Sequence, residues 1–149
     1  MTPLATDMIR SGADRHGSGV AVRFGSENLT FAQVDALSSR MAATLASDAA
    51  PGATVGLMTN NGLFSVPLDF ACLKARLTRV PLNARLSPAE QAQMLEGIGV
   101  RRLIYSADLA DRAAALAATV TGLTITALSD AQTDPKRGER QRTIVADRC

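Results

Sequence analysis

The apolar residues of this 149-residue chain follow two spacings, one typical of helices and one typical of buried strands. Apolar residues three or four positions apart predict one helix that runs to about Asp48, and its predicted face is Phe31, Val34, Leu37, Met41 and Leu45. The segment TVGLMT at 54–59 is apolar without polar alternation, as expected for a strand covered on both faces. This part of the chain therefore predicts a helix followed by a buried strand.

The same two spacings predict further elements up to residue 128. Helices are expected over 4–15, 63–77, 88–97 and 109–120, and strands over 20–24, 79–82, 102–105 and 123–128. Residues 25–28 are expected to form the turn of a hairpin between 20–24 and Leu29-Thr30. The predicted apolar faces are Leu4, Met8 and Ile9 on the first helix, and Leu63, Val66, Phe70, Leu73 and Leu77 on the helix over 63–77.

Strands that alternate with helices predict the α/β class. We expect βαβ units that form a parallel, doubly wound sheet, as in many nucleotide-binding domains. Apart from aromatic residues, which are only 3% of the chain, the core must come from aliphatic side chains. Residues 1–130 are predicted to form one partial domain, and residues 131–149 a disordered basic tail without periodicity.

Helix starts carry the most specific local signals. Thr30 and Gln33 match a capping box, in which each side chain accepts a hydrogen bond from the backbone of the other residue. Ser87 and Glu90 match a second box, with Pro88 at the first helical position, where its missing N–H costs nothing. These signals place two helix starts at residues 31 and 88.

Two further residues carry positional expectations. Pro81 cannot donate to a strand ladder, so the strand over 79–82 is expected at a sheet edge or to end there. Asp108 is expected to cap the helix over 109–120, because carboxylates are favoured at helix amino termini. Asp111 lies in the first turn of the same helix, so the two carboxylates are not read as an acid/base pair.

Charge and composition exclude several classes of function. Of 16 Lys and Arg and 14 Asp and Glu, the last sixteen residues hold five and three, which leaves eleven of each in the rest of the chain. This balanced body predicts no nucleic-acid partner. Polar residues interrupt the most apolar window, 55–77, so no membrane span is expected. Two cysteines without a C-x-x-C motif predict a reduced, cytoplasmic protein without a zinc site.

Standard catalytic motifs are missing from the sequence. Neither G-x-x-x-x-G-K-[ST] nor G-x-G-x-x-G follows a predicted strand, and His16 lies in a Gly/Ser-rich loop without a nucleophile partner. Three arginines near predicted strand ends could meet a phosphate, although exposed arginines more often only aid solubility: Arg85, Arg101 and Arg112. The residues alone therefore predict no catalytic site.

The order of several segments resembles one known family. The segments are LTFAQVDALSSRMAATL, then Pro51-Gly52, TVGLMTNN, FACLKA, VPLNARLSPAE and RRLIYSA. Over about residues 21–116 they resemble the amino-terminal portion of the AMP-forming, adenylate-forming enzymes, particularly acyl-CoA synthetases. The resemblance implies the first part of that family's N-terminal domain.

The same resemblance implies a reaction of two steps. A carboxylate attacks ATP to give an acyl-adenylate and pyrophosphate, and CoA then displaces AMP. ATP, Mg²⁺ and CoA are the ligands of full-length members, but the phosphate loop and the catalytic lysine of the family do not occur in this sequence. We therefore expect no cofactor bound by this chain alone, no catalytic residue and no resident metal.

The resemblance also implies three candidate contacts to the CoA nucleotide, which are Asn83, Ala84 and Arg112. The alternative is that Asn83 and Arg85 only stabilise a turn. One departure from the family is Arg76, because members usually have glycine after the Lys-Ala pair that matches Lys74-Ala75. A side chain at that turn position puts the end of the preceding helix in question.

Three hypotheses about function remain open. The first is an amino-terminal fragment or truncated relative of an AMP-forming acyl-CoA synthetase that is not catalytic alone. The second is a stand-alone interaction module or a subunit of a split synthetase, because a sheet cut from a larger domain favours self-association or binding to the remainder of the synthetase. The third is a domain that binds a nucleotide by itself at the carboxyl ends of its strands.

Overall fold

A computed structural model describes residues 5–128 of the chain. The predicted tail at 131–149, and Leu4 of the first predicted helix, lie outside the described residues. The described chain divides into two compact units. The first comprises residues 5–48 and 62–75, and the second comprises residues 49–61 and 76–128.

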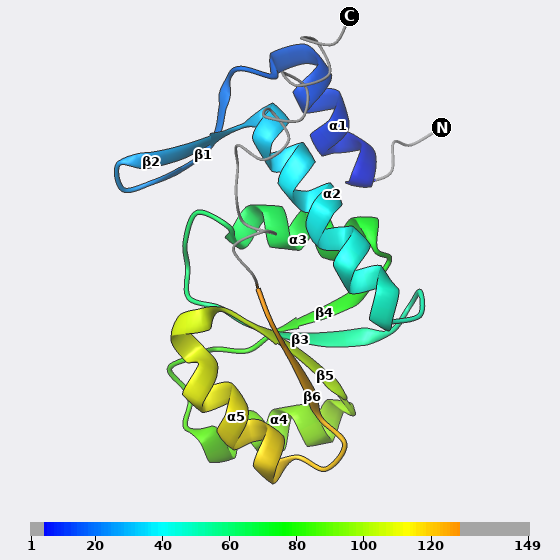
Figure 1. The fold of residues 1–149 in the computed structure, drawn as a ribbon, viewed down its shortest axis with the longest axis vertical. Helices are drawn as coiled ribbons and strands as arrows, with labels where there is room; N and C mark the ends of the chain where they lie inside the picture. The colour runs from blue at the N-terminus through cyan, green and yellow to red at the C-terminus, as the bar shows by residue number, and fades with distance from the viewer. Residues whose placement is uncertain (1–4, 129–149) are drawn as a thin grey trace, which may run out of the picture. The chain divides into compact units, whose positions relative to one another are not determined.

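The first unit contains three helices and a hairpin (Figure 1). In chain order these are α1 (Ala5–His16), β1 (Val20–Phe24), β2 (Glu27–Thr30), α2 (Phe31–Asp48) and α3 (Ser65–Lys74). The two strands are antiparallel, and their turn is shorter than predicted because β2 already begins at Glu27. The apolar core of this unit is made by Ile9, Leu29, Val34 and Leu37.

Local signals set the start and the packing of α2. Thr30 N donates to Gln33 Oε1 over 2.9 Å, and Gln33 N donates to Thr30 Oγ1 over 3.2 Å, which confirms the predicted capping box. The predicted face of α2 is also confirmed, since Val34, Leu37, Met41 and Leu45 are buried. An ion pair joins α2 to α3, with Lys74 Nζ 2.7 Å from Asp35 Oδ1.

The second unit is a four-stranded parallel sheet in the order β4-β3-β5-β6. Its elements are β3 (Thr54–Met58), β4 (Thr78–Pro81), α4 (Pro88–Ile98), β5 (Arg102–Tyr105), the short 3-10 helix η1 (Ala107–Leu109), α5 (Ala110–Thr119) and β6 (Thr124–Ala127). The α/β class and the parallel sheet are therefore confirmed. Pro81 is the last residue of β4, which is an edge strand, as predicted.

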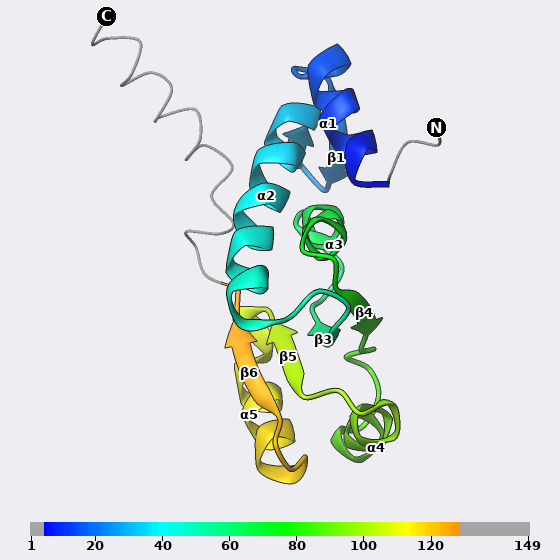
Figure 2. The same cartoon turned by 90° about the vertical axis from the view of Figure 1, so that its right-hand side faces the viewer.

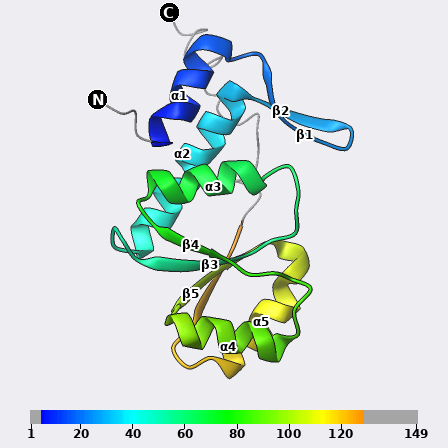
Figure 3. The same ribbon diagram turned by 180° about the vertical axis from the view of Figure 1, so that it is seen from behind.

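Helices α4 and α5 lie side by side and pack with the sheet through one apolar core (Figure 3). Figure 2 shows α5 alongside β5 and β6. The core is drawn from both helices and from the strands, and includes Met58, Leu82, Leu95, Leu103 and Leu116. Gly56 of β3 lies against this core, because an added Cβ there would meet Leu103 Cδ1 at 3.0 Å and Leu95 Cδ2 at 3.2 Å.

The structure corrects two predicted helix faces. On α1, Ile9 is buried as expected, but Met8 is 65% exposed. On α3 the buried residues are Pro67, Leu68, Ala71 and Cys72, whereas Val66 and Leu73 are exposed and Leu77 lies beyond the helix. Since α3 carries apolar residues on several sides, their spacing alone did not identify the buried face.

The ends of α4 and α3 were also addressed from the sequence. Helix α4 continues past Gly97 to Ile98 and ends at Gly99, which has a left-handed φ of 80°. Helix α3 ends at Lys74, with Ala75 as its C-cap, and Arg76 then adopts a positive φ of 57°. The helix therefore ends two residues before Arg76, and an arginine occupies the left-handed position that follows the C-cap.

Among residues 5–128, no helix has both the length and the apolar character needed to cross a membrane.

Candidate functional site at the carboxyl ends of β3 and β4

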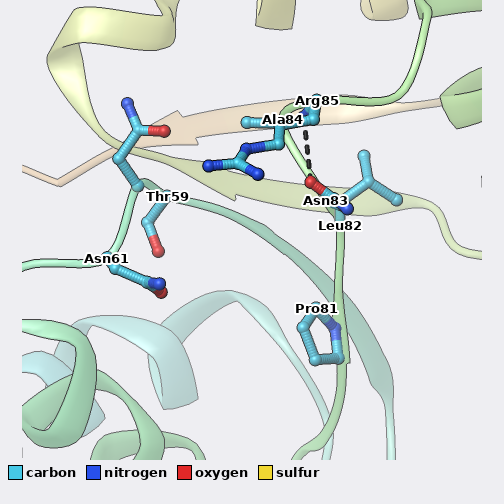
Figure 4. A pocket seen from close by; sticks show the side chains of 8 residues that line it. Thr59, Asn61, Pro81, Leu82, Asn83, Ala84 and Arg85 are labelled. Carbon is cyan, nitrogen blue, oxygen red and sulfur yellow. Dashed lines mark hydrogen bonds between the residues drawn. The ribbon is translucent and has the colours of Figure 1, made fainter.

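An open cavity of about 600 Å³ lies where β3 and β4 end. It is lined by two segments of the second unit that follow neighbouring strands, Thr59-Asn60-Asn61 after β3 and Pro81-Leu82-Asn83-Ala84-Arg85 at the end of β4. Figure 4 shows the side chains of Thr59, Asn61 and Arg85 around this cavity. Ligands of open parallel sheets bind at this end of the strands, so the position suits a binding site.

Backbone geometry after β4 shapes one wall of the cavity. Leu82 N donates to Leu57 O over 2.7 Å, which continues the ladder for one residue past Pro81, and the Leu82 side chain is buried. Arg85 N then donates to Asn83 Oδ1 over 2.9 Å, which forms a turn closed by the asparagine side chain (Figure 4). This turn leaves the Arg85 side chain exposed at the cavity.

One side chain of α4 and one of α5 donate hydrogen bonds to the same turn. Gln91 Nε2 donates to Asn83 O over 2.8 Å. Arg112 Nη1 donates to Ala84 O and to Leu86 O, both over 2.7 Å. The backbone carbonyls of three residues between 83 and 86 are therefore held by side chains of the helices.

The three predicted site residues are brought together by these contacts. Asn83 and Ala84 line the cavity, and Arg112 lies outside the lining but bonds the Ala84 carbonyl. Both readings of Asn83 remain compatible with this geometry, because its Oδ1 closes the turn while its Nδ2 has no protein acceptor among the described residues.

Other residues singled out from the sequence lie elsewhere, apart from Arg85, which lines the cavity. Arg101 Nη1 donates to the carbonyl of its neighbour Val100, and its side chain lies beside Gly122. His16 ends α1 in the first unit, where its ring centroid is 6.1 Å from that of Phe31. Thr59 and Asn61 were not predicted as site residues; the signal for them is their position directly after a buried parallel strand.

Asp108 does not cap α5, which corrects the sequence-based prediction. The N-cap position of α5 is Leu109, without a side-chain cap, and the Asp108 carboxylate instead accepts a 2.6 Å hydrogen bond from Asn60 Nδ2. Neighbouring Ser106 and then Asn60 lower the pKa of Asp108. The bond joins the segments that follow β3 and β5. These two strands are neighbours in the sheet, and the strand order changes direction between them, since β4 is added on one side of β3 and β5 on the other.

The cavity offers hydrogen-bond donors and a positive charge. Its wall presents the Arg85 guanidinium and the Asn83 amide nitrogen, groups that suit phosphate or carbonyl oxygens. Within the described part of the chain, no group of three or more His, Cys, Asp and Glu residues could hold a metal ion. The donors and the positive charge of this cavity therefore suit an anionic ligand.

Comparisons with known proteins show the family to which the sequence is similar. The family described as AMP-binding enzyme matches residues 9–147. A feruloyl-CoA synthase from an Amycolatopsis species is 36% identical over 99 residues, which are 66% of this chain and 20% of that protein.

Solved structures match as well. The N-terminal domain of FACL13 from Mycobacterium tuberculosis has a TM-score of 0.76 at 27% identity, over 89% of this chain and 35% of that one. O-succinylbenzoate CoA synthetase from Bacillus subtilis, in complex with AMP, has a TM-score of 0.63 at 28% identity, over 67% of this chain and 26% of that one. The chain thus spans only about a fifth of the feruloyl-CoA synthase and about a quarter to a third of these structures.

Proposed function

The chain belongs to the AMP-binding enzyme family, and we propose that it forms the amino-terminal portion of an AMP-forming acyl-CoA synthetase and borders the site of the CoA nucleotide. The full reaction of such an enzyme joins a carboxylate to CoA at the expense of ATP, with AMP and pyrophosphate as products. By this proposal ATP and Mg²⁺ are held by residues outside the described segment, and the chain is not catalytic alone.

One observation supports the proposal most. Asn83 and Ala84, which the family resemblance marks as neighbours of the CoA nucleotide, line a donor-rich cavity, and Arg112 bonds the same turn. The Arg85 guanidinium adds a fixed positive charge beside them. Phosphates match such charged, forked donors in both charge and geometry.

The unpaired edges of the sheet also support the proposal that this chain is a portion of a larger domain. Within residues 5–128 the outer sides of β4 and β6 pair with no further strand. Unpaired strand edges are sites for association with another segment or chain. We therefore propose the remainder of the synthetase as the partner of this segment.

The reaction can be tested with a chimera. Residues 5–128 would replace the matching segment of the Amycolatopsis feruloyl-CoA synthase, and carboxylate-dependent exchange between ATP and pyrophosphate would be measured. We expect exchange by the chimera and none by the 149-residue chain alone. Exchange by the chain alone, or a folded chimera without exchange, would contradict the proposal.

The ligand can be tested on the same chimera by titration calorimetry with CoA. We expect Arg85→Ala to weaken CoA binding by about tenfold, the effect of losing one hydrogen bond to a charged group. Arg23→Ala, which removes an exposed arginine of the hairpin in the first unit, is the matched control. Equal binding by the two variants would count against the cavity as the CoA site.

A further inference from the structure

We infer that Gln91 and Arg112 are positioning residues, which fix the backbone of residues 83–86 and thereby preset the ligand-facing groups of the cavity. The inference rests on the proposed function for the identity of the ligand. It differs from the sequence-based prediction, which placed Arg112 in direct contact with that ligand. Its basis is the set of hydrogen bonds that hold the turn after β4.

The first observation is how Arg112 uses its donors. Both of its short bonds come from Nη1, and both end on backbone carbonyls of the turn, Ala84 O and Leu86 O. A single guanidinium nitrogen therefore spans two residues of the turn, and its charge strengthens both bonds. Since Nη1 carries only two hydrogens, these carbonyls use all of its donors.

The second observation is the burial of Gln91. Its side chain is 0% exposed, and it donates from Nε2 to Asn83 O over 2.8 Å. Its Oε1 is buried without a protein hydrogen-bond partner within residues 5–128. An unsatisfied buried amide oxygen is unfavourable for folding, so an apolar residue of similar size would be expected here if packing were the only requirement.

These two residues reach the turn from different helices. Gln91 belongs to α4 and Arg112 to α5, and the helices pack on a common core with Leu95 and Leu116 fully or almost fully buried. The turn is thus held from a rigid base, while Asn83 Nδ2 and the Arg85 guanidinium stay available at the cavity. Fixed donors bind a ligand more tightly because less conformational entropy is lost on binding.

The inference is tested with four variants of the 149-residue chain: Gln91→Met, Arg112→Met, Arg112→Lys and the control Gln93→Met. Gln93 lies on the same helix but is exposed, so the control makes the same chemical change away from the turn. The measurements on the chain are the backbone amide NMR signals of residues 84–86 without ligand and the midpoint of thermal unfolding. CoA affinity is measured by calorimetry with the same substitutions placed in the feruloyl-CoA synthase chimera.

We expect Gln91→Met and Arg112→Met to shift or broaden the signals of residues 84–86 and to weaken CoA binding by about tenfold. Gln91→Met should do so without lowering the unfolding midpoint, because it also removes the unsatisfied Oε1. Arg112→Lys should recover part of the affinity, since an ammonium group can bond one of the two carbonyls. If Gln91 only stabilised the fold, its replacement would weaken CoA binding only together with a lower unfolding midpoint.

Unchanged turn signals in both methionine variants, compared with the Gln93→Met control, would overturn the inference. So would a fall in the unfolding midpoint without a change at the turn. If the chimera without these substitutions does not bind CoA, the proposed function fails. The positioning role is then decided by the signals of residues 84–86, which need no ligand.

Discussion

The amide nitrogen of Gly52 lies 2.7 Å from the carbonyl oxygen of Arg76, and this hydrogen bond joins the turn before β3 to the turn before β4. Both residues have positive φ, 85° for Gly52 and 57° for Arg76. For glycine this conformation carries no steric penalty, whereas for arginine the Cβ makes it unfavourable. The chain therefore tolerates local strain at Arg76, an exposed residue at which the chain enters the second unit again after α3.

Replacing Arg76 by glycine should stabilise the protein. We expect Arg76→Gly to raise the free energy of unfolding by about 0.5–1 kcal/mol, because relief of the left-handed strain outweighs the greater freedom of glycine in the unfolded chain. Arg76→Ala keeps the Cβ and loses only the guanidinium, so it should give no gain. Urea denaturation of the three proteins checks this; equal stability of the glycine and alanine variants would contradict the argument.

Signals that act within a few residues were sufficient to predict much of this fold. The capping boxes of Thr30 with Gln33 and of Ser87 with Glu90 are confirmed, because each involves only groups three residues apart. Strand β5 was predicted at the bounds that it has, and Pro81 at the end of an edge strand. Local chemistry is thus sufficient to predict these features.

Features that depend on packing between distant segments could not be predicted from the sequence. The buried face of α3 is set by the partners of the helix, and Leu68 is buried while neighbouring Val66 is 39% exposed. Likewise, Thr59 and Asn83 line one cavity only because β4 pairs with β3, a strand order that the alternation of elements does not specify. The prediction that Asp108 caps α5 was wrong because its carboxylate bonds Asn60 instead, and a contact between residues so far apart in the chain has no local signal.

The two glycines at positions 56 and 97 should respond to alanine in opposite ways. Gly56→Ala should lower the free energy of unfolding by about 1–3 kcal/mol, because the new methyl would overpack against Leu103 and Leu95. Gly97→Ala should raise it by about 0.5 kcal/mol, since that helical position has nothing within 4 Å of an added Cβ. Chemical denaturation of both variants checks this, and a stabilising Gly56→Ala would show that the contact is looser than described.

The ion pair between α2 and α3 should contribute to stability more than most surface pairs. Lys74 Nζ contacts Asp35 Oδ1, Asp35 O and Ser39 Oγ within 3.0 Å, and its side chain is only 13% exposed. We expect Lys74→Met to lower the free energy of unfolding by about 2 kcal/mol. A double-mutant cycle with Asp35→Asn measures the coupling; a value near zero would mean that the pair behaves as an exposed one.

The cap of α4 should make stability depend on pH through Glu90. Its carboxylate accepts from Ser87 N and from Ser87 Oγ, both over 2.8 Å. The hydrogen bond from the Ser87 backbone, and then that from its side chain, lower the pKa of Glu90 from its ordinary value of 4.5. A pKa lowered by folding means that the charged form is favoured in the folded protein.

This contribution is therefore fully present above pH 4.5, the value for the unfolded chain, and is lost as the pH falls through the lower folded value. We expect the stability difference between the unmutated chain and Glu90→Gln to be constant from pH 7 to about pH 5.5 and to shrink toward pH 3. Asp108, whose pKa is also lowered, titrates in both proteins, so its effect cancels in the difference. Urea denaturation across this range measures it, and a difference independent of pH would mean that the Glu90 charge adds nothing to the cap.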